Sequence, residues 1–277
     1  MHLLEDIKTV RTIEIIAHRG AAGKAPENTM ASIQQAITDG TDWVEIDVQE
    51  TIDGKVIVLH DSDYMKIAGV NKKIWDLSYQ ETQAIDIGSW FDKKFASERT
   101  PTLAEILQLA KGKVKVLIEL KYYGHTEKLE QRVASIVKQN EMTDNIAIMS
   151  LKLDGIQKFQ AIQPQWQTGL LTTKAIGKVS AMKLDFMAIN IAAATPAFIS
   201  SIHNGGKDVY VWTVNEQIAM FRMMSLGVDG IITDEPELAV NVRKKFMELS
   251  TVERLAFYAM VRFNKTLPKK VYRDNSP

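Results

Sequence analysis

The chain has 277 residues, of which 45% are hydrophobic and 25% charged, a composition typical of globular proteins. Thirty-four basic residues balance thirty-four acidic ones, so no net charge attracts the chain to nucleic acid or to an anionic membrane. Cysteine is absent, which excludes disulfide bonds, thiolate zinc sites and thiol nucleophiles. The first residues lack the apolar core of a secretory signal, and no apolar run approaches the roughly 18 residues of a membrane-spanning helix.

Strand-like and helix-like segments alternate along the chain. The predicted strands are residues 13–17, 43–48, 56–59, 114–120, 145–149, 167–171, 186–190, 208–213 and 230–233. The predicted helices are residues 28–39, 103–110, 127–139, 152–162, 175–183, 196–204, 215–226 and 236–246. With the short run at 56–59 counted in the second unit, eight strand–helix units result. Apolar strands alternating with helices are typical of a parallel sheet covered on its outer face, and eight units favour a closed barrel over an open sheet.

Residues 61–100 interrupt this alternation. We interpret them as an insertion over one end of the barrel, with an irregular loop as the alternative. Their aromatic residues Trp75, Trp90 and Phe91 are expected to pack locally rather than to contact a ligand. The chain is therefore expected to form one barrel domain over residues 1–249, followed by a tail at 250–277.

The tail carries apolar residues at helical spacing and ends in basic residues. The apolar stripe consists of Val252, Leu255, Ala256, Ala259, Met260 and Phe263, and the basic residues are Lys265, Lys269, Lys270 and Arg273. A stripe of this kind can lie on a membrane, so membrane contact stays open. We expect it to pack on the chain's own barrel instead. The sequence does not fix the oligomeric state.

Ionisable residues end several of the predicted apolar strands: His18, Glu45, Asp47, His60, Glu119 and Lys121. Such groups are costly at strand ends unless a site uses them. Residues two apart share one face of a strand, so Glu45 and Asp47 point the same way. Because the intervening Ile46 is apolar and suits the layer between strands and helices, the charged side chains are expected at the barrel mouth.

Three converging carboxylates would repel one another strongly without a cation between them. A ligand set made only of oxygen favours magnesium, calcium or manganese over zinc. The alternative is that Glu119 pairs with Lys121, and Glu45 with Arg19, as buried ion pairs. The two histidines suit general acid and base roles, and the positive charges of Arg19 and Lys121 suit a phosphoryl group.

Together these motifs resemble the glycerophosphodiester phosphodiesterase family. The motifs are, in order, His18-Arg19-Gly20, Pro26-Glu27-Asn28-Thr29, Glu45-Ile46-Asp47-Val48, Asp53-Gly54, His60-Asp61, Pro101-Thr102-Leu103, Glu119-Leu120-Lys121, Trp212-Thr213-Val214-Asn215 and Gly230-Ile231-Ile232-Thr233-Asp234. The resemblance extends from about Ile15 to Pro236. It implies a TIM (β/α)8 barrel with a small insertion after the second β/α unit, in agreement with the interruption at 61–100.

Carried over by position, the resemblance implies a role for each residue of the site. His18 and His60 would be the acid/base pair, and Glu45, Asp47 and Glu119 would hold one divalent metal ion. The metal would be Mg²⁺ or Ca²⁺, with Mn²⁺ as a further option. The residues implied in binding substrate are Arg19 and Lys121, on the phosphate, and Trp212, near the substrate mouth, for which packing at the barrel rim is the alternative. Glu27 and Asn28 are expected to support the site, and Asp234 is expected to cap the helix that begins at Pro236.

The function implied is metal-dependent hydrolysis of a small glycerophosphodiester to sn-glycerol 3-phosphate and an alcohol. One histidine would deprotonate the nucleophile and the other would protonate the leaving alcohol. Two alternatives stay open: a lyso-phospholipid or lipoteichoic-type phosphodiesterase at a membrane surface, and a non-catalytic barrel that binds phosphoglycerol. The compartment is open between the cytoplasm and the soluble domain of a membrane-associated bacterial protein.

Overall fold

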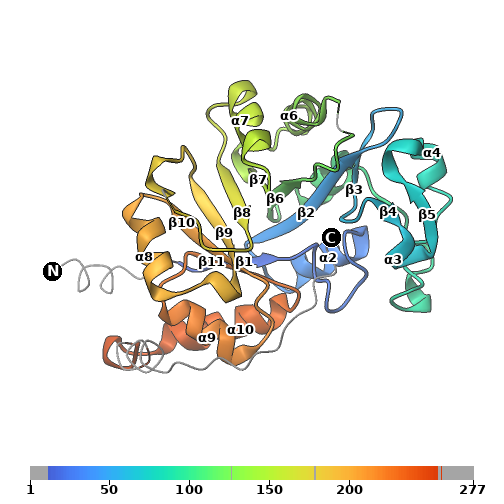
Figure 1. Ribbon diagram of the computed structural model, residues 1–277. Helices are drawn as coiled ribbons and strands as arrows, with labels where there is room; N and C mark the ends of the chain where they lie inside the picture. The colour runs from blue at the N-terminus through green and yellow to red at the C-terminus, as the bar shows by residue number, and fades with distance from the viewer. Residues whose placement is uncertain (1–11, 126, 178, 255–256, 258–277) are drawn as a thin grey trace.

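The computed structural model describes residues 12–125, 127–177, 179–254 and 257. In this part of the chain, parallel strands close into a barrel, because β1 pairs with both β2 and β11 (Figure 1). The barrel strands are β1 (Glu14–Ala17), β2 (Trp43–Glu50), β6 (Lys115–Leu120), β7 (Ile146–Ser150), β8 (Thr168–Thr172), β9 (Phe186–Asn190), β10 (Asp208–Trp212) and β11 (Gly230–Thr233). The expected TIM barrel is confirmed.

Helices surround the barrel: α2 (Met30–Thr38), α5 (Leu103–Ala110), α6 (Leu129–Gln139), α7 (Leu153–Ile162), α8 (Pro196–Asn204), α9 (Gln217–Ser225) and α10 (Pro236–Glu248). Alternate strand residues face two different cores. Val44 and Ile46 pack outward with the helices, whereas Ile16, Leu117 and Met149 fill the barrel interior. Among the described residues, no helix combines the length and the apolar character needed to cross a bilayer.

The segment between β8 and β9 differs from the predicted helix at residues 175–183. Its described residues form only a 3₁₀ turn, η4 (Val179–Ala181), so that prediction is wrong. Gly177 interrupts the segment and disfavours an α-helix there. Ile176, Val179 and Met182 still pack against the core between strands and helices. Their spacing of three residues, which indicated a helix, is also satisfied by a 3₁₀ turn.

The insertion follows β3 (Val56–Val58), which pairs antiparallel with β2. Its elements, at the right of Figure 1, are β4 (Asp63–Tyr64), α3 (Met65–Ala68), β5 (Val70–Lys73), η1 (Ile74–Asp76), α4 (Tyr79–Thr82) and η2 (Lys93–Phe95). A separate apolar cluster holds it: Ile57, Leu59, Tyr64, Ile67, Ile74, Leu77 and Ile87. Trp75 stacks on His125 with 4.0 Å between ring centroids, and Trp90 meets Phe91 edge-on at 5.7 Å. The insertion thus packs on itself and on the rim of the barrel.

Two further 3₁₀ turns complete the described structure, η3 (Thr143–Asn145) and η5 (Ile191–Ala193). Most of the tail lies outside the described residues, including the predicted stripe at Leu255, Ala256, Ala259, Met260 and Phe263 with its basic end. Val252 is described and is 74% exposed.

Candidate active site

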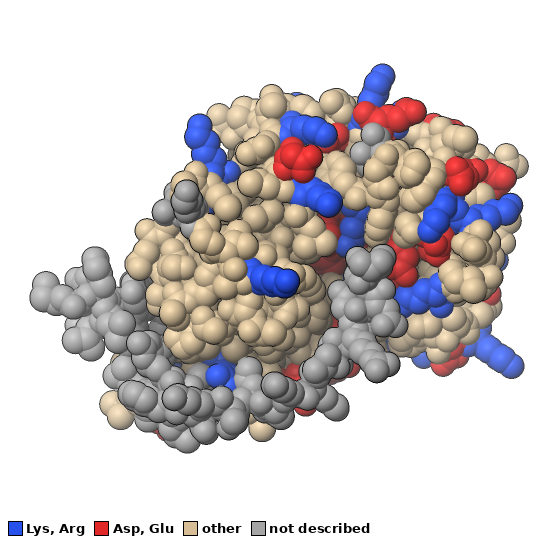
Figure 2. Space-filling view, in the orientation of Figure 1, with Lys and Arg blue, Asp and Glu red and all other residues tan. Residues whose placement is uncertain are grey.

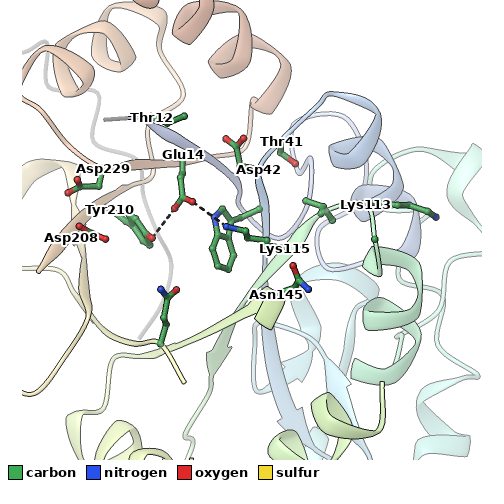
Figure 3. A pocket seen from close by; sticks show the side chains of 14 residues that line it. Thr12, Glu14, Thr41, Asp42, Lys113, Lys115, Asn145, Asp208, Tyr210 and Asp229 are labelled. Carbon is green, nitrogen blue, oxygen red and sulfur yellow. Dashed lines mark hydrogen bonds and ion pairs between the residues drawn. The ribbon is translucent and has the colours of Figure 1, made fainter. Parts of the chain in front are cut away.

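The two ends of the barrel differ in how their charged groups are paired. At the amino ends of the strands lies a cavity of about 810 Å³ (Figure 3). There Tyr210 donates a hydrogen bond to Glu14, and the Lys115 ammonium lies 3.8 Å from Glu14 Oε1 and 4.8 Å from the centre of a Trp43 ring. Charge at that end is therefore locally paired. At the carboxyl ends, where TIM-barrel enzymes place their active sites, several buried carboxylate oxygens have no hydrogen-bond donor in the part of the chain that the structure describes.

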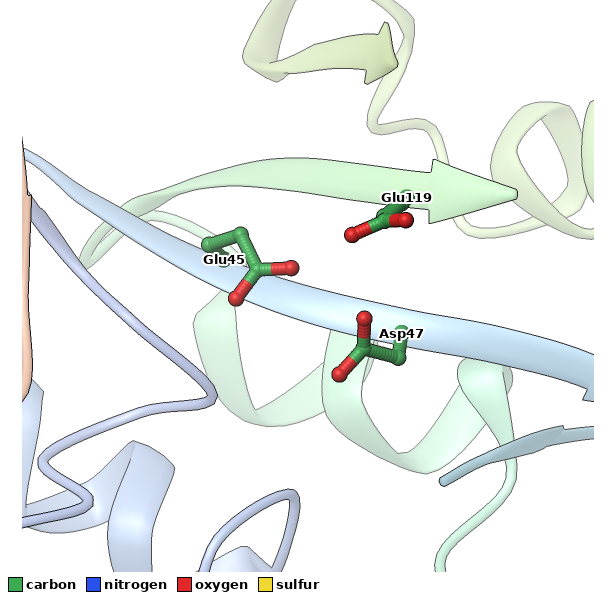
Figure 4. A group of neighbouring side chains, drawn as sticks. All are labelled: Glu45, Asp47 and Glu119. Atoms are coloured by element: carbon green, nitrogen blue, oxygen red, sulfur yellow. The ribbon is translucent and has the colours of Figure 1, made fainter. Parts of the chain in front are cut away.

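Three buried carboxylates meet at the carboxyl ends of β2 and β6 (Figure 4). Glu45 and Asp47 extend from the interior face of β2, and Glu119 lies opposite Asp47 on the neighbouring β6. One oxygen of each carboxylate lies within 4.8 Å of an oxygen of the other two. Exposure is at most 4% for these residues, so water screens their mutual repulsion poorly.

The Lys121 ammonium lies directly against two of the carboxylates. Lys121 Nζ is 3.0 Å from Asp47 Oδ1 and 2.8 Å from Glu119 Oε1. The ion pair between Glu119 and Lys121, which the alternative interpretation named, is therefore present. Neither contact has hydrogen-bond geometry, and both oxygens lack a donor among the described residues. Burial alone would raise the pKa of Asp47, but the charges of Lys121, His60 and Arg19 hold it well below its usual value.

Glu45 is the carboxylate with the least compensation. Burial and the charge of Asp47 raise the pKa of Glu45 to about 8. Its Oε2 accepts a hydrogen bond of 2.8 Å from the backbone N–H of Arg19, and its Oε1 has no donor among the described residues. The ion pair between Glu45 and the Arg19 guanidinium, which belongs to the alternative interpretation, is not formed, because that group lies 3.0 Å from Glu27 and 3.4 Å from Asp47.

The carboxylate cluster has the donor chemistry of a hard divalent cation. Oxygens that bind Mg²⁺ or Ca²⁺ lie about 2.0–2.6 Å from the ion, so ligands of one ion are separated by at most roughly 5 Å. The separations within the cluster meet this condition. The buried oxygens without donors, one on each carboxylate, could serve as ligands. Glu45, Asp47 and Glu119 thus fit a divalent metal ion.

Each of the two histidines is held by a neighbouring carboxylate. His18 Nδ1 lies 2.7 Å from Asp234 Oδ1, and His60 Nδ1 lies 2.6 Å from Asp61 Oδ1. The hydrogen bond from His60 lowers the pKa of Asp61. Burial raises the pKa of Asp234, but the charge of His18 and its hydrogen bond outweigh burial and lower it. Both carboxylates are therefore ionised and accept the Nδ1 proton, which leaves each Nε2 for proton transfer.

Asp234 corrects the sequence-based prediction. We expected it to cap the helix at Pro236, but the N-cap of α10 is Glu235 and no side chain caps that end. The Asp234 carboxylate instead accepts hydrogen bonds from His18 and, at 2.6 Å, from Asn215 Nδ2. The sequence held a signal for this role. Gly230 and Ile232 alternate with Asp234 at the two-residue period that points side chains into the barrel.

A tight turn after β1 explains why His18 is followed by Arg19 and Gly20. Gly20 has φ +80°, and a Cβ there would lie 2.5 Å from Ser32 Oγ. Arg19, with φ +53°, is a non-glycine residue in the left-handed region, and its N–H reaches Glu45 from this conformation. Asn28, with φ +57°, donates from Nδ2 to Asp47 Oδ2 at 2.8 Å. The turn thus orients two of the three carboxylates.

His60 is also fixed through its backbone. Gln49, on the same face of β2 as Glu45 and Asp47, donates to the carbonyl oxygens of Leu59 and Asp61, each at 2.7 Å. Tyr123 donates its hydroxyl proton to the carbonyl oxygen of His60 at 2.6 Å. These contacts join the loop after β3 to the carboxylate cluster.

Trp212, the last residue of β10, packs against the apolar interior of the barrel. Its indole N–H donates to the Ala188 carbonyl oxygen at 3.1 Å. The structure therefore brings histidines, carboxylates and cations together at the ends of β1, β2, β3, β6 and β11, and it places Trp212 on β10, the neighbour of β11. Two carboxylate-held histidines beside a cluster that fits a divalent cation are the groups from which metal-assisted hydrolases on TIM barrels are built.

The chain belongs to the glycerophosphoryl diester phosphodiesterase family, whose sequence model matches residues 18–238. It is 32% identical over 241 residues to a glycerophosphodiester phosphodiesterase of Caldanaerobacter subterraneus, an alignment covering 83% of this chain and 98% of the relative. Its fold matches an Oleispira antarctica phosphodiesterase solved with the product sn-glycerol-3-phosphate, at 25% identity and TM-score 0.80, covering 83% and 96% of the two chains. A glycerophosphodiester phosphodiesterase from Agrobacterium tumefaciens matches at 28% identity and TM-score 0.73, covering 83% and 99%.

Proposed function

We propose that this chain hydrolyses glycerophosphodiesters to sn-glycerol 3-phosphate and an alcohol. The observation that carries the proposal is a buried cluster of three carboxylates with two carboxylate-held histidines beside it. One oxygen of each carboxylate in the cluster has no donor among the residues that the structure describes. Family membership supports the same reaction class.

In this proposal Glu45, Asp47 and Glu119 hold one Mg²⁺ or Ca²⁺ ion, with Mn²⁺ as a further candidate. When bound, the ion polarises the phosphoryl group and offsets the negative charge that develops on it. The Arg19 guanidinium and the Lys121 ammonium supply fixed positive charge beside the same phosphate. Since Lys121 already contacts Asp47 and Glu119, its charge is held at the cluster before the substrate arrives.

His18 and His60 transfer the protons. Asp234 and Asp61 hold the two rings by Nδ1, so that Nε2 of one ring accepts the proton of the attacking hydroxyl and Nε2 of the other donates to the leaving alcohol. Asp61 is next to His60 in sequence, whereas Asp234 comes from the last strand–helix connection. Trp212 bounds the site on the apolar side.

Release of sn-glycerol 3-phosphate from glycerophosphocholine tests the proposal. Activity should disappear with EDTA and return with excess Mg²⁺ or Ca²⁺, whereas a barrel that only binds phosphoglycerol would release no product. H18A and H60A should each lose about 10²–10⁴-fold in kcat. H203Q is the matched control, because His203 also pairs with a carboxylate, Asp229 at 2.8 Å, away from the carboxylate cluster. Full activity in the H18A/H60A double variant, with its melting temperature unchanged, would refute the assignment.

A further inference from the structure

The Lys121 ammonium contacts oxygen atoms that a divalent ion would need as ligands. The contacts are those described above, with Asp47 Oδ1 and with Glu119 Oε1. These two oxygens and Glu45 Oε1 are the buried oxygens of the cluster that lack a hydrogen-bond donor among the described residues. Two of the three candidate ligand oxygens are therefore already in contact with a cation.

Charge, rather than directed hydrogen bonding, holds the ammonium at the cluster. Both contacts of Lys121 are short, yet neither has hydrogen-bond geometry. The other oxygen of Asp47, Oδ2, accepts a well-formed hydrogen bond from Asn28 at 2.8 Å. Electrostatic attraction grows with the charge of the partner, so a contact made by one positive charge is weaker than the same contact made by two. A divalent ion therefore competes effectively with Lys121 for these oxygens.

The Lys121 side chain has room to move while its backbone stays in place. The backbone N–H donates to the Val48 carbonyl oxygen at 3.2 Å, and four flexible carbons separate the ammonium from that backbone. Lys121 also lines a cavity of about 10 Å³, the size of one water molecule, together with Gln49, Glu50, Trp75, Tyr123 and His125. Trp75 belongs to the insertion, over which Figure 2 shows acidic and basic groups mixed, whereas the face over β8, β9, β10 and α8 is largely tan. The ammonium thus has space, in polar surroundings, on a side that none of the three carboxylates lines.

The charges of the site favour an exchange of partners. Lys121 is 7% exposed, so water would screen its repulsion from a divalent ion on the same oxygens only weakly. The three carboxylates, Arg19 and Lys121 together carry one formal negative charge, and a divalent ion turns this into one positive charge. A phosphodiester carries one negative charge. It is therefore the anion that can replace the carboxylates as the partner of Lys121.

We propose that Lys121 is a displaceable counter-ion, which leaves Asp47 and Glu119 for the substrate phosphate when the metal ion binds. In the metal-free protein the ammonium compensates the two carboxylates. In the metal-bound protein it is released toward the phosphate, so the metal ion and the phosphate strengthen each other's binding through Lys121. The inference rests on the metal-dependent function proposed above and adds a coupling between its two ligands.

Calorimetric titration of the metal-free protein with Ca²⁺ tests this exchange. K121M has no ammonium to displace, so it should bind Ca²⁺ about tenfold more tightly than the wild type, within the usual range of coupling between two ligands. A residue that only supported the carboxylates would give the opposite result, because removing such a support weakens metal binding roughly 10- to 100-fold. K207M is the matched control, because Lys207 is also a buried lysine but donates to the Gly205 carbonyl oxygen before β10. It should bind Ca²⁺ as the wild type does.

The product sn-glycerol 3-phosphate gives a second measurement in the same calorimeter. A saturating concentration should tighten Ca²⁺ binding in both proteins, and by about tenfold more in the wild type than in K121M, because only the wild type has an ammonium that passes from the carboxylates to the phosphate. Equal tightening in the two proteins would overturn the inference.

Crystal structures of the wild-type protein with and without Ca²⁺ keep the inference falsifiable even if K121M does not fold. Lys121 Nζ should contact Asp47 and Glu119 without Ca²⁺ and lie more than about 4 Å from both carboxylates with it. An ammonium that keeps both contacts beside bound Ca²⁺, or a folded K121M that binds Ca²⁺ no more tightly than the wild type, would overturn the exchange and leave the proposed function standing. Absence of any binding of Ca²⁺, Mg²⁺ or Mn²⁺ to the wild type would refute the metal-dependent function itself.

Discussion

The buried carboxylates should make the metal-free protein less stable as pH rises. An acid whose pKa is higher in the folded state than in the unfolded chain stabilises the fold below its unfolded pKa. That stability is lost as pH rises through the folded pKa. Glu45 meets this condition, because burial raises its pKa from 4.5 to about 8. Each pH unit corresponds to about 1.4 kcal/mol, so the free energy of unfolding should fall by about 5 kcal/mol across this interval.

Urea unfolding in EDTA at pH 5, 6, 7 and 8 measures this dependence, and E45Q should remove most of it. A smaller pH dependence of the free energy of unfolding should remain in E45Q. Burial also raises the pKa of Glu119, and the pKa of His18 is raised as well, because the charges of Asp234 and Glu45 outweigh the lowering effect of burial. E248Q, which changes an exposed glutamate at the end of α10, should follow the wild type.

Saturating Mg²⁺ or Ca²⁺ should abolish the destabilisation at pH 8, since the ion compensates the ionised carboxylates. Equal slopes in wild type and E45Q, or a wild-type stability that rises between pH 5 and 8 in EDTA, would refute the reasoning.

Three further outcomes follow from particular contacts. D234N keeps the size of the side chain but removes the charge that orients His18. It should lower kcat roughly 100-fold with little change in melting temperature. An unchanged kcat would contradict the role assigned to Asp234. N28A should weaken metal binding measured by calorimetry, because Asn28 donates to Asp47, and an unaltered affinity would contradict it. T102A should lower the free energy of unfolding by about 1 kcal/mol, because Thr102 and Glu105 form the capping box of α5; no loss in urea unfolding would contradict this.

The barrel could be predicted from sequence because its strands are short apolar runs with one geometry. Strand β9 (Phe186–Asn190) and helices α5 and α8 have the predicted bounds, and the helix boundaries coincide with Pro, Thr and Gly signals. The segment at 175–183 could not be predicted this way, because its apolar spacing fits two kinds of helix.

The carboxylate cluster could also be predicted, since Glu45 and Asp47 share one face of a single strand. The partner of His18 was missed for a physical reason. Asp234 precedes a proline-initiated helix, where an acidic residue usually caps the helix, and only its place at the end of a barrel strand reveals the alternative. Local rules describe a residue's neighbours along the chain, whereas the contact with His18 joins residues 216 positions apart.

The contact between His18 and Asp234 can form only after the last strand of the barrel has been synthesised. The ribosome completes β1, β2 and β6, and with them all three carboxylates, long before Asp234 emerges. Until β11 docks against β1, His18 has no carboxylate to fix its ring. A chain released early therefore carries all three carboxylates while the His18 ring still lacks its contact with Asp234, so that closure of the barrel completes the arrangement of the site.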